Sequence, residues 1–451
     1  MWDSFCYPHI LNKIIKKVIT LKFREEIVKF KDKELIIRER NNRVLMYNTR
    51  FKRHIIQSKE VYSYIKKAEE MGLTVEEFVD MFEGSDKEYM KDLMINMGKA
   101  GILESSMSED FYKNMNNRFK AIYLAATHKC NLACRHCCTN CNSMEKDILT
   151  TEDVKSIMDF VAELEPYEFI ITGGEPMIRS DFEECVHYFK EKDCKTELVL
   201  STNATLIDES NVDFIVNHFN RVEISIDGVD EETCGLIRGK GVFNKIMRAI
   251  VLLHTRGFRN IRTSMVVGDK NEHLEEKFYD LNERIGTKGM VRCFEPEGRG
   301  VENASYFISE ETILPFGLTE LDKLSFEKDK DNLKSCSCDM YKSKMFIDYD
   351  GNMYPCQSLI KAKYSYGSAL DKETRMSVID FDYDLSDSKL ATRLQNIMPY
   401  NFEKCKDCDV NIFCFFCPAL IDKLLDNEDC PDYKKWCSIM KPQLNRIVWG
   451  E

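Results

Sequence analysis

The stretch that decides the fold runs from residue 121 to residue 137 and reads AIYLAATHKCNLACRHC. Its first seven residues form a short apolar run, which is typical of a buried β-strand. Cys130, Cys134 and Cys137 follow this run directly, so we expect them on one loop at the carboxyl end of the strand. Three thiolates on one loop are suited to bind a zinc ion or an iron–sulfur cluster. A cysteine-rich turn without metal is the alternative.

Downstream of this loop, short apolar runs alternate with longer amphipathic stretches up to about residue 295. The runs read YEFIITG, TELVLST, RVEISID, NIRTSMVV and GMVRCFEP. The stretches between them, such as 151–164 and 243–255, have the periodicity of amphipathic helices. This alternation predicts an α/β fold with parallel strands and helical crossovers. An open doubly wound sheet and a partial barrel both fit six such units, and both collect ligands at the carboxyl ends of their strands.

Polar groups stand at the ends of several of these strands. The second strand ends in Thr172-Gly-Gly-Glu-Pro176, the third in Ser201-Thr-Asn203 and the fourth in Ser225-Ile-Asp-Gly228, and Arg238 follows in RGKGVF. Glycines let the backbone approach a ligand closely, and an arginine suits a carboxylate. Each motif alone is ordinary turn or capping chemistry. Their placement at successive strand ends predicts a ligand site at that edge of the sheet.

The 451 residues carry 19 cysteines and a formal net charge of −12. A chain of this length is expected to form two or three domains. The acidic balance argues against a general affinity for nucleic acid or anionic membranes. We expect a cytoplasmic protein, because the first residues lack the build of a signal peptide and apolar stretches such as 249–253 are too short to cross a bilayer. In a reducing compartment, clustered cysteines bind metal more often than they form disulfides.

A second group of cysteines lies in the carboxyl-terminal part, where regular periodicity fades after residues 325–335. They are Cys336, Cys338, Cys356, Cys405, Cys408, Cys414, Cys417, Cys430 and Cys437. Such a region lacks the pattern of a large apolar core, so we expect bound metal to supply part of its folding energy. A zinc ribbon built from the Cys-x2-Cys pairs is the alternative.

The first hundred residues predict a small sheet followed by helices. Apolar and β-branched runs at 25–30, 34–40 and 43–49 are broken by polar turns and indicate strands. Helical patterns begin at Lys59, and capping-box signatures at Thr74–Glu77 and Ser85–Glu88 predict the starts of two short helices. We therefore expect strands followed by three helices, ending near Leu103.

In this order, the Cys-x3-Cys-x2-Cys, GGEP, STNA, SIDG and RGxGxF motifs resemble the radical S-adenosylmethionine (SAM) superfamily over about residues 119–299. The resemblance implies a core domain over residues 119–300 with a partial (β/α)6 TIM barrel and SAM at its mouth. It implies that Cys130, Cys134 and Cys137 bind a [4Fe–4S] cluster with one open iron. It also implies that Gly173, Gly174 and Glu175 line the SAM amino group, that Ser225 and Arg238 hold its carboxylate, and that Asn203 and Asp227 lie beside its ribose. His136 stands where the superfamily often has another aromatic ring.

The carboxyl-terminal cysteines resemble the SPASM extension of radical SAM enzymes over residues 335–451. Such domains hold two auxiliary [4Fe–4S] clusters, so the resemblance implies three clusters in all. It assigns Cys405, Cys408, Cys414 and Cys437 to the second auxiliary cluster, and Cys336 or Cys338 with Cys356 and Cys417 to the first. One departure bears on Cys417, because two residues separate it from Cys414 where the extension has three. Cys430 competes with Cys437 for the last position.

The amino-terminal pattern, over residues 1–105, resembles the PqqD-like, winged-helix-like elements that recognise leader peptides. Such elements add the leader as an extra strand on a sheet edge. A dimerisation domain or a purely structural domain is the alternative.

Together, the three parts resemble peptide maturases. They imply an enzyme that installs thioether crosslinks in a ribosomally synthesised precursor peptide and receives electrons from a flavodoxin or ferredoxin. The alternatives are carbon–carbon crosslinking, sulfatase maturation and a peptide-binding iron–sulfur protein without catalysis. Sulfatase-maturing enzymes place an acidic residue directly after the cysteine of a Gly-x4-Cys motif. In this chain the motif runs from Gly351 to Cys356, and the next residue is Gln357. We expect Cys138 and Cys141 to pack without binding metal, the alternative being a thiol pair near the substrate.

Overall fold

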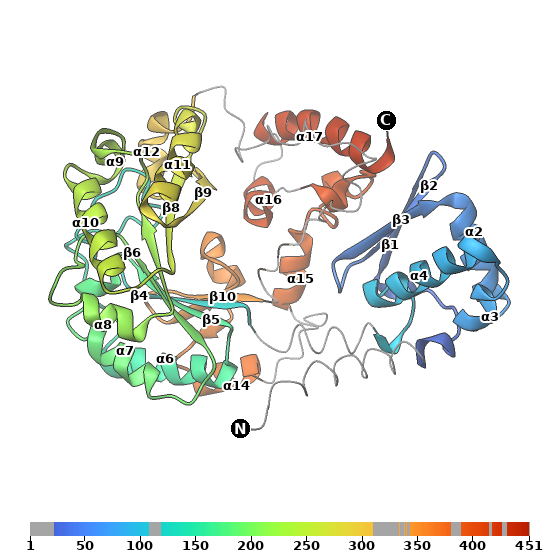
Figure 1. Ribbon diagram of the computed structural model, residues 1–451, viewed down its shortest axis with the longest axis horizontal. Helices are drawn as coiled ribbons and strands as arrows, with labels where there is room; N and C mark the ends of the chain where they lie inside the picture. The colour runs from blue at the N-terminus through green and yellow to red at the C-terminus, as the bar shows by residue number, and fades with distance from the viewer. Residues whose placement is uncertain are drawn as a thin grey trace.

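The computed structural model describes residues 22–107, 119–309, 343–379, 389–414, 417–425 and 431–450, together with Leu333, Cys338 and Met340. In Figure 1 the helices α15 (Lys389–Asn396), α16 (Pro418–Leu425) and α17 (Pro431–Trp449) lie between a large sheet with its helices and a small amino-terminal sheet. Among the described helices, none combines the length and the apolar character needed to cross a membrane.

Six parallel strands form the larger part of the large sheet and pair in chain order. They are β4 (Ala121–Thr127), β5 (Glu168–Gly173), β6 (Glu197–Thr202), β7 (Arg221–Ser225), β8 (Ile261–Val267) and β9 (Lys288–Cys293). The predicted α/β fold is confirmed. A doubly wound sheet reverses its strand order at a switch point, whereas these six strands follow one another without reversal, as in a (β/α) barrel.

The helices between these strands cover one face of the sheet (Figure 1). They are α6 (Thr151–Leu164), α7 (Phe182–Lys190), α8 (Val212–His218), α9 (Glu231–Arg238), α10 (Val242–Thr255) and α11 (Glu275–Ile285). Alternate strand residues such as Leu124, Phe169 and Ile224 are buried against them in the main core. The opposite face carries a small separate cluster of Ala121, Ile170 and Val199. Because side chains alternate between the two faces of a strand, the polar residues at the strand ends lie next to this opposite face.

Three further strands extend the sheet beyond β4. They are β10 (Lys344–Ile347), which pairs parallel to β4, and β11 (Asn352–Tyr354) and β12 (Gly367–Ser368), which follow antiparallel. The turn between β10 and β11 reaches the loop after β4, where the rings of Tyr349 and His128 stack with centroids 4.3 Å apart. The carboxyl-terminal part is therefore built onto the barrel sheet itself.

The amino-terminal sheet consists of β1 (Leu35–Arg40), β2 (Arg43–Asn48) and β3 (Arg53–Ser58), all antiparallel, followed by α2 (Lys59–Glu70), α3 (Val75–Val79) and α4 (Gly84–Ala100). The predicted strand at 25–30 is wrong, since these residues make only isolated bridges from Ile27 and Phe30. The third strand is instead β3, whose arginine, histidine and glutamine obscure its apolar pattern.

Of the two predicted capping boxes, the one at Thr74 and Glu77 is confirmed. The one at Ser85 is wrong, because the N-cap of α4 is Glu83, two residues earlier, and it makes no side-chain capping bond. At 17 residues, α4 is also longer than the short helix that we expected.

Strand β2 is buried on both faces. Val44 and Met46 point into the core of the amino-terminal helices, whereas Leu45 and Tyr47 belong to the core of the carboxyl-terminal part. The rings of Tyr47 and Tyr400 lie 5.9 Å apart, and Arg40 forms an ion pair with Asp409 at 2.7 Å. The small sheet is thus sandwiched between its own helices and the carboxyl-terminal part.

Candidate functional site

The loop after β4 carries the three cysteines of the Cys-x3-Cys-x2-Cys motif at the carboxyl end of the parallel sheet. Cys130 and Cys134 are buried, and Cys137 is partly exposed. The amide of Cys130 donates to the carbonyl of Asn142 at 3.0 Å, which closes the base of the loop. We refer to residues 128–142 as the cysteine loop.

The segment after β9 packs over the cysteine loop and was missed by the sequence analysis. Arg299 donates from Nε to the carbonyl of Cys134 at 3.1 Å and from a terminal nitrogen to the carbonyl of Cys141 at 2.8 Å. Its own amide donates to the carbonyl of Cys137 at 3.0 Å. Gly298 has a φ of 53°, and a Cβ there would lie 2.5 Å from the Cys137 oxygen. The signal in the sequence was the pair of glycines around Arg299 after the sixth strand.

Asp227 and Arg238 form a buried ion pair next to the cysteine loop. Arg238 donates from Nε to Oδ2 of Asp227 at 2.6 Å, and His136 Nε2 lies 2.8 Å from the same oxygen. The other oxygen of Asp227 accepts from the amide of Val266 at 2.6 Å. Burial raises the pKa of Asp227, but the charge of Arg238 and the contact with His136 outweigh this and hold the pKa below its usual range.

Two nitrogen atoms of this network are available to a ligand, one on Arg238 and one on His136. Arg238 places a terminal nitrogen 3.7 Å from the sulfur of Cys134. His136 Nδ1 is buried and has no hydrogen-bond partner among the described residues. A buried imidazole nitrogen without a partner is costly unless a ligand satisfies it. The donor set at this strand edge therefore fits a polar ligand held beside three thiolates.

The GGEP motif packs against the cysteine loop through its backbone. The amide of Gly174 donates to the carbonyl of Thr127, and that of Glu175 to the carbonyl of Lys129, both at 2.8 Å. A Cβ on Gly174 would lie 2.0 Å from the Lys129 oxygen, so only glycine allows this approach.

The carboxylate of Glu175 is fully buried and faces the end of β6. It accepts from Thr202 Oγ1 at 2.8 Å, from the amide of Asn203 at 2.8 Å and from the amide of Met177 at 3.2 Å. Burial raises the pKa of Glu175 to about 7 although these donors oppose the shift. Glu175 therefore ties β5 to β6.

Asn203 and Ser225 lie at the same edge of the sheet. Asn203 donates to Asn131 Oδ1 at 2.9 Å, and its amide nitrogen lies 3.9 Å from the sulfur of Cys130. Ser225 is the last residue of β7 and pairs in register with Ser264. The structure thus brings the predicted SAM-binding residues of three strand ends to the side of the cysteine loop.

The two extra cysteines of the loop differ in their surroundings. Cys141 is buried, and its sulfur lies 3.0 Å from Thr139 Oγ1. A hydrogen bond from Cys141 lowers the pKa of Cys137. Cys138 is exposed. The expected packing role therefore describes the surroundings of Cys141 better than those of Cys138.

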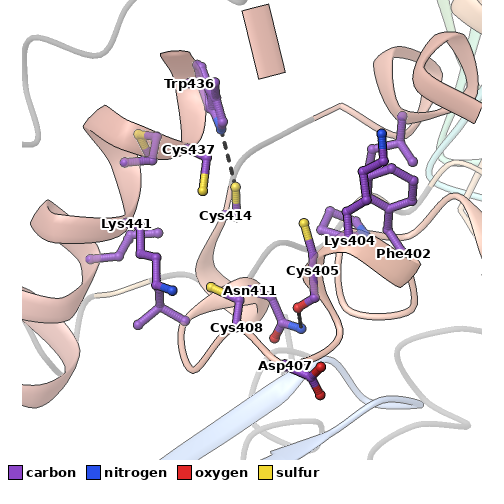
Figure 2. Close-up of a pocket in the computed structure, with 15 residues that line it drawn as sticks. Phe402, Lys404, Cys405, Asp407, Cys408, Asn411, Cys414, Trp436, Cys437 and Lys441 are labelled. Atoms are coloured by element: carbon purple, nitrogen blue, oxygen red, sulfur yellow. Dashed lines mark hydrogen bonds between the residues drawn. The ribbon is translucent and has the colours of Figure 1, made fainter. Parts of the chain in front are cut away.

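Four carboxyl-terminal cysteines line one cavity of about 210 Å³ (Figure 2). They are Cys405, Cys408, Cys414 and Cys437. The indole Nε1 of Trp436 donates to the sulfur of Cys414 at 3.3 Å, and Asn411 Nδ2 donates to the carbonyl of Cys405 at 2.8 Å. These are the four residues that the SPASM resemblance groups together, whereas Cys430 lies outside the described residues. Four thiols around one cavity are a donor set that fits an iron–sulfur cluster.

Cys338, Cys356 and Cys417 form a separate group. Burial, together with the neighbouring Cys338 and Cys417, raises the pKa of Cys356 to about 12. Burial likewise raises the pKa of Cys417 to about 11, with contributions from Glu295 and Cys338. Cys417 does not line the cavity that holds Cys414, although only two residues separate them. Cys336 lies outside the described residues.

The central part of the chain is similar to proteins of known family. Residues 124–281 match the model of the Radical SAM superfamily. Mycofactocin maturase MftC of Mycolicibacterium smegmatis is 33% identical over 177 residues, which cover 39% of this chain and 45% of that protein. AdoMet-dependent heme synthase of Nitratidesulfovibrio vulgaris is 32% identical over 195 residues, covering 42% of this chain and 52% of that protein. The chain thus spans about half the length of these curated relatives.

Among solved structures, Streptococcus suis SuiB bound to the precursor peptide SuiA matches with a TM-score of 0.51 and 14% identity, covering 88% of this chain and 96% of that chain. SuiB bound to S-adenosylmethionine gives a TM-score of 0.50 with 16% identity over 87% of this chain and 96% of that chain. At this identity the likeness shows the fold alone. Residues 124–281 are therefore similar to the Radical SAM superfamily, and the fold of the chain is similar to that of SuiB.

Proposed function

We propose that this chain contains a radical SAM domain and is a cytoplasmic maturase. It installs thioether crosslinks in a ribosomally synthesised precursor peptide. The observation that carries the proposal is the pairing of two cysteine sites. One is the cysteine loop beside the buried Asp227–Arg238 pair, and the other is the carboxyl-terminal cavity lined by four cysteines. A catalytic cluster and a second cluster-binding domain are what such a maturase needs.

In the core domain, over residues 119–300, Cys130, Cys134 and Cys137 hold a [4Fe–4S] cluster. With SAM bound, this cluster supplies the electron that yields a 5′-deoxyadenosyl radical, which removes a hydrogen atom from the peptide. Gly173, Gly174 and Glu175 line the amino group of SAM, Ser225 and Arg238 hold its carboxylate, and Asn203 and Asp227 lie beside its ribose. The unpartnered Nδ1 of His136 is available to the bound nucleoside.

The carboxyl-terminal residues 335–451 form a SPASM domain with two auxiliary [4Fe–4S] clusters. Cys405, Cys408, Cys414 and Cys437 bind one of them, and their common cavity supports this assignment. Cys356 and Cys417, with Cys336 or Cys338, bind the other. A metal-bound thiol is deprotonated outright. If an auxiliary cluster bound the peptide cysteine, that cysteine would need no dedicated base, and the electron released when the sulfur bonds to the carbon radical would pass to that cluster.

Residues 1–105 form a PqqD-like recognition element for the leader of the precursor. Both faces of β2 are buried, so a peptide has access to this sheet only along an edge, at β1 or β3. Strand addition at an edge is the mode by which such sheets bind extended peptides. Because the sheet packs on the carboxyl-terminal part, a bound leader is held next to the domain that carries the auxiliary cysteines.

Gln357 favours crosslinking over sulfatase maturation. It begins the short turn Gln357–Leu359 directly after Cys356 and is exposed. Oxidation of a cysteine or serine to an aldehyde requires a base that takes the heteroatom proton, which a neutral amide does not supply. Carbon–carbon crosslinking stays as the second candidate, since it too needs no base at this position.

The test is incubation of the reconstituted enzyme with SAM, a flavodoxin or ferredoxin as reductant, and a cysteine-containing precursor. A thioether product has lost two hydrogen atoms and one alkylatable thiol per crosslink. Replacing the acceptor cysteine of the peptide by serine is expected to abolish that product while SAM cleavage continues. The same mass loss with an unchanged thiol count would instead assign a carbon–carbon crosslink, and formylglycine would assign sulfatase maturation.

A further inference from the structure

A fully buried carboxylate in α16 binds two lysines at once. Asp422 has no exposed surface. Lys363 Nζ lies 2.5 Å from its Oδ1, and Lys361 Nζ contacts its Oδ2. The hydroxyl of Tyr364, itself buried, donates to Oδ1 at 2.5 Å. One negative charge therefore faces two positive charges, and the group keeps one positive charge in excess.

This group connects the two segments that carry Cys356 and Cys417. The carbonyl of Cys417 accepts from the amides of Leu420 and Ile421 at 2.9 and 3.1 Å, so Cys417 stands at the start of α16. Asp422 follows five residues later, about 7.5 Å along the helix axis. Both lysines directly follow the turn after Cys356. In that turn the carbonyl of Cys356 accepts from the amide of Leu359 at 3.1 Å. The ion pairs thus fix one cysteine segment to the other.

The next residue of α16 makes the connection to the barrel. Lys423 Nζ lies 2.7 Å from Glu297 Oε1, in the segment after β9. That segment is the one in which Arg299 holds the carbonyls of the cysteine loop. Through Asp422 and Lys423, α16 therefore contacts both the turn after Cys356 and the segment that packs over the cysteine loop.

We propose that Asp422, Lys361 and Lys363 form a positioning group for the auxiliary cluster at Cys356 and Cys417, and that its excess positive charge raises the reduction potential of that cluster. The inference rests on the proposed function, because it requires a cluster at these cysteines. A thiolate-bound cluster is anionic and gains further negative charge when reduced, so nearby positive charge favours the reduced form. The side chains of Lys361 and Lys363 are 40% and 39% exposed, so solvent screens part of their charge and the shift is smaller than for buried lysines.

The test is the potential of each cluster, measured by EPR-monitored titration of the anaerobically reconstituted full chain. Lys361→Met and Lys363→Met each remove one positive charge and are expected to lower the potential of this auxiliary cluster. Asp422→Asn removes the negative charge and is expected to raise it. Tyr364→Phe removes a hydrogen bond to Asp422 Oδ1 without changing the charge, and this control is expected to shift the potential least.

Shifts of opposite sign for the lysine and aspartate variants would support the proposal, since a merely structural role does not depend on the sign of the charge removed. Shifts in the same direction, or none, would overturn it. If Asp422→Asn cannot be purified with its iron, the lysine variants and Tyr364→Phe decide the matter. The proposed function is tested separately: if Cys356→Ala with Cys417→Ala leaves iron content and EPR spectrum unchanged, the cluster assignment itself is wrong.

Discussion

Arg238 and Asp227 form an ion pair in which Nε lies 2.6 Å from Oδ2, and both side chains are buried beside Cys134. Asp227 has a φ of 51°, a left-handed conformation that is uncommon for a residue other than glycine. The turn after β7 therefore holds a strained residue whose carboxylate compensates the arginine. The strain lies where the proposed SAM site requires a fixed charge.

Asp227→Asn is expected to destabilise the fold by about 3–5 kcal/mol, because it leaves the buried Arg238 without its counter-charge. The free energy of unfolding, from denaturant titration, measures this loss. Glu209→Gln is the matched control, since Glu209 pairs with Arg248 on the surface and both side chains are more than half exposed. We expect no measurable change from that variant. Equal effects of the two would show that burial does not set the strength of the Asp227 pair.

Metal content tests the cysteine assignments. Anaerobically reconstituted protein is expected to contain about twelve irons, from three four-iron clusters. Replacing Cys130, Cys134 and Cys137 by alanine is expected to leave about eight, and replacing the four cysteines of the cavity is expected to leave about the same number. Iron analysis beside EPR spectroscopy distinguishes the two losses. A full iron load in the first variant would contradict the assignment of the cysteine loop.

The recognition element is best tested by changing the peptide. Deleting residues 1–104 would uncover the core surface that Leu45 and Tyr47 fill, so the resulting loss of activity would be ambiguous. A core peptide without its leader is expected to be modified with a raised KM, because strand addition raises the effective concentration of the core at the site. SAM cleavage driven by dithionite should stay unchanged. Equal KM values with and without the leader would refute leader binding.

The buried Glu175 predicts a pH dependence of stability. Its pKa of about 7 lies above the ordinary value of 4.5, so the folded protein binds more protons than the unfolded chain between these values. The free energy of unfolding contributed by this group therefore falls as pH rises through that window, by about 3 kcal/mol in all. Glu175→Gln should flatten this slope. A variant with the same slope as the parent would assign the pH dependence to another group.

The sequence predicted best those features that repeat locally. Six strands and their helices follow from periodicity, and their polar ends converge because parallel strands share one carboxyl edge. The grouping of Cys405, Cys408, Cys414 and Cys437 depended on resemblance, since spacing alone does not tell which thiols face one cavity. Arg299 was missed because its role is to bond backbone carbonyls more than 150 residues earlier in the chain, and the two glycines beside it do not reveal those distant partners.

The extension of the sheet was missed for the same reason. Lys344 pairs with Ala121 across more than 200 residues, and the four residues of β10 are too few to show a period. Likewise, β3 reads as a polar stretch until its alternation between two cores is seen, with Ile55 facing the amino-terminal helices and Ile56 the carboxyl-terminal part.

The placement of Leu45 and Tyr47 has a consequence for how the chain is made. These side chains share a core with residues such as Tyr400 and Leu444, which follow more than 350 residues later in the chain. During synthesis the small sheet packs on its own helices but exposes its second face until the carboxyl-terminal part has been made. Since exposed apolar surface on a nascent chain invites aggregation, this face is an expected site of chaperone contact. The small sheet is thus completed only after the residues that follow the barrel have been made.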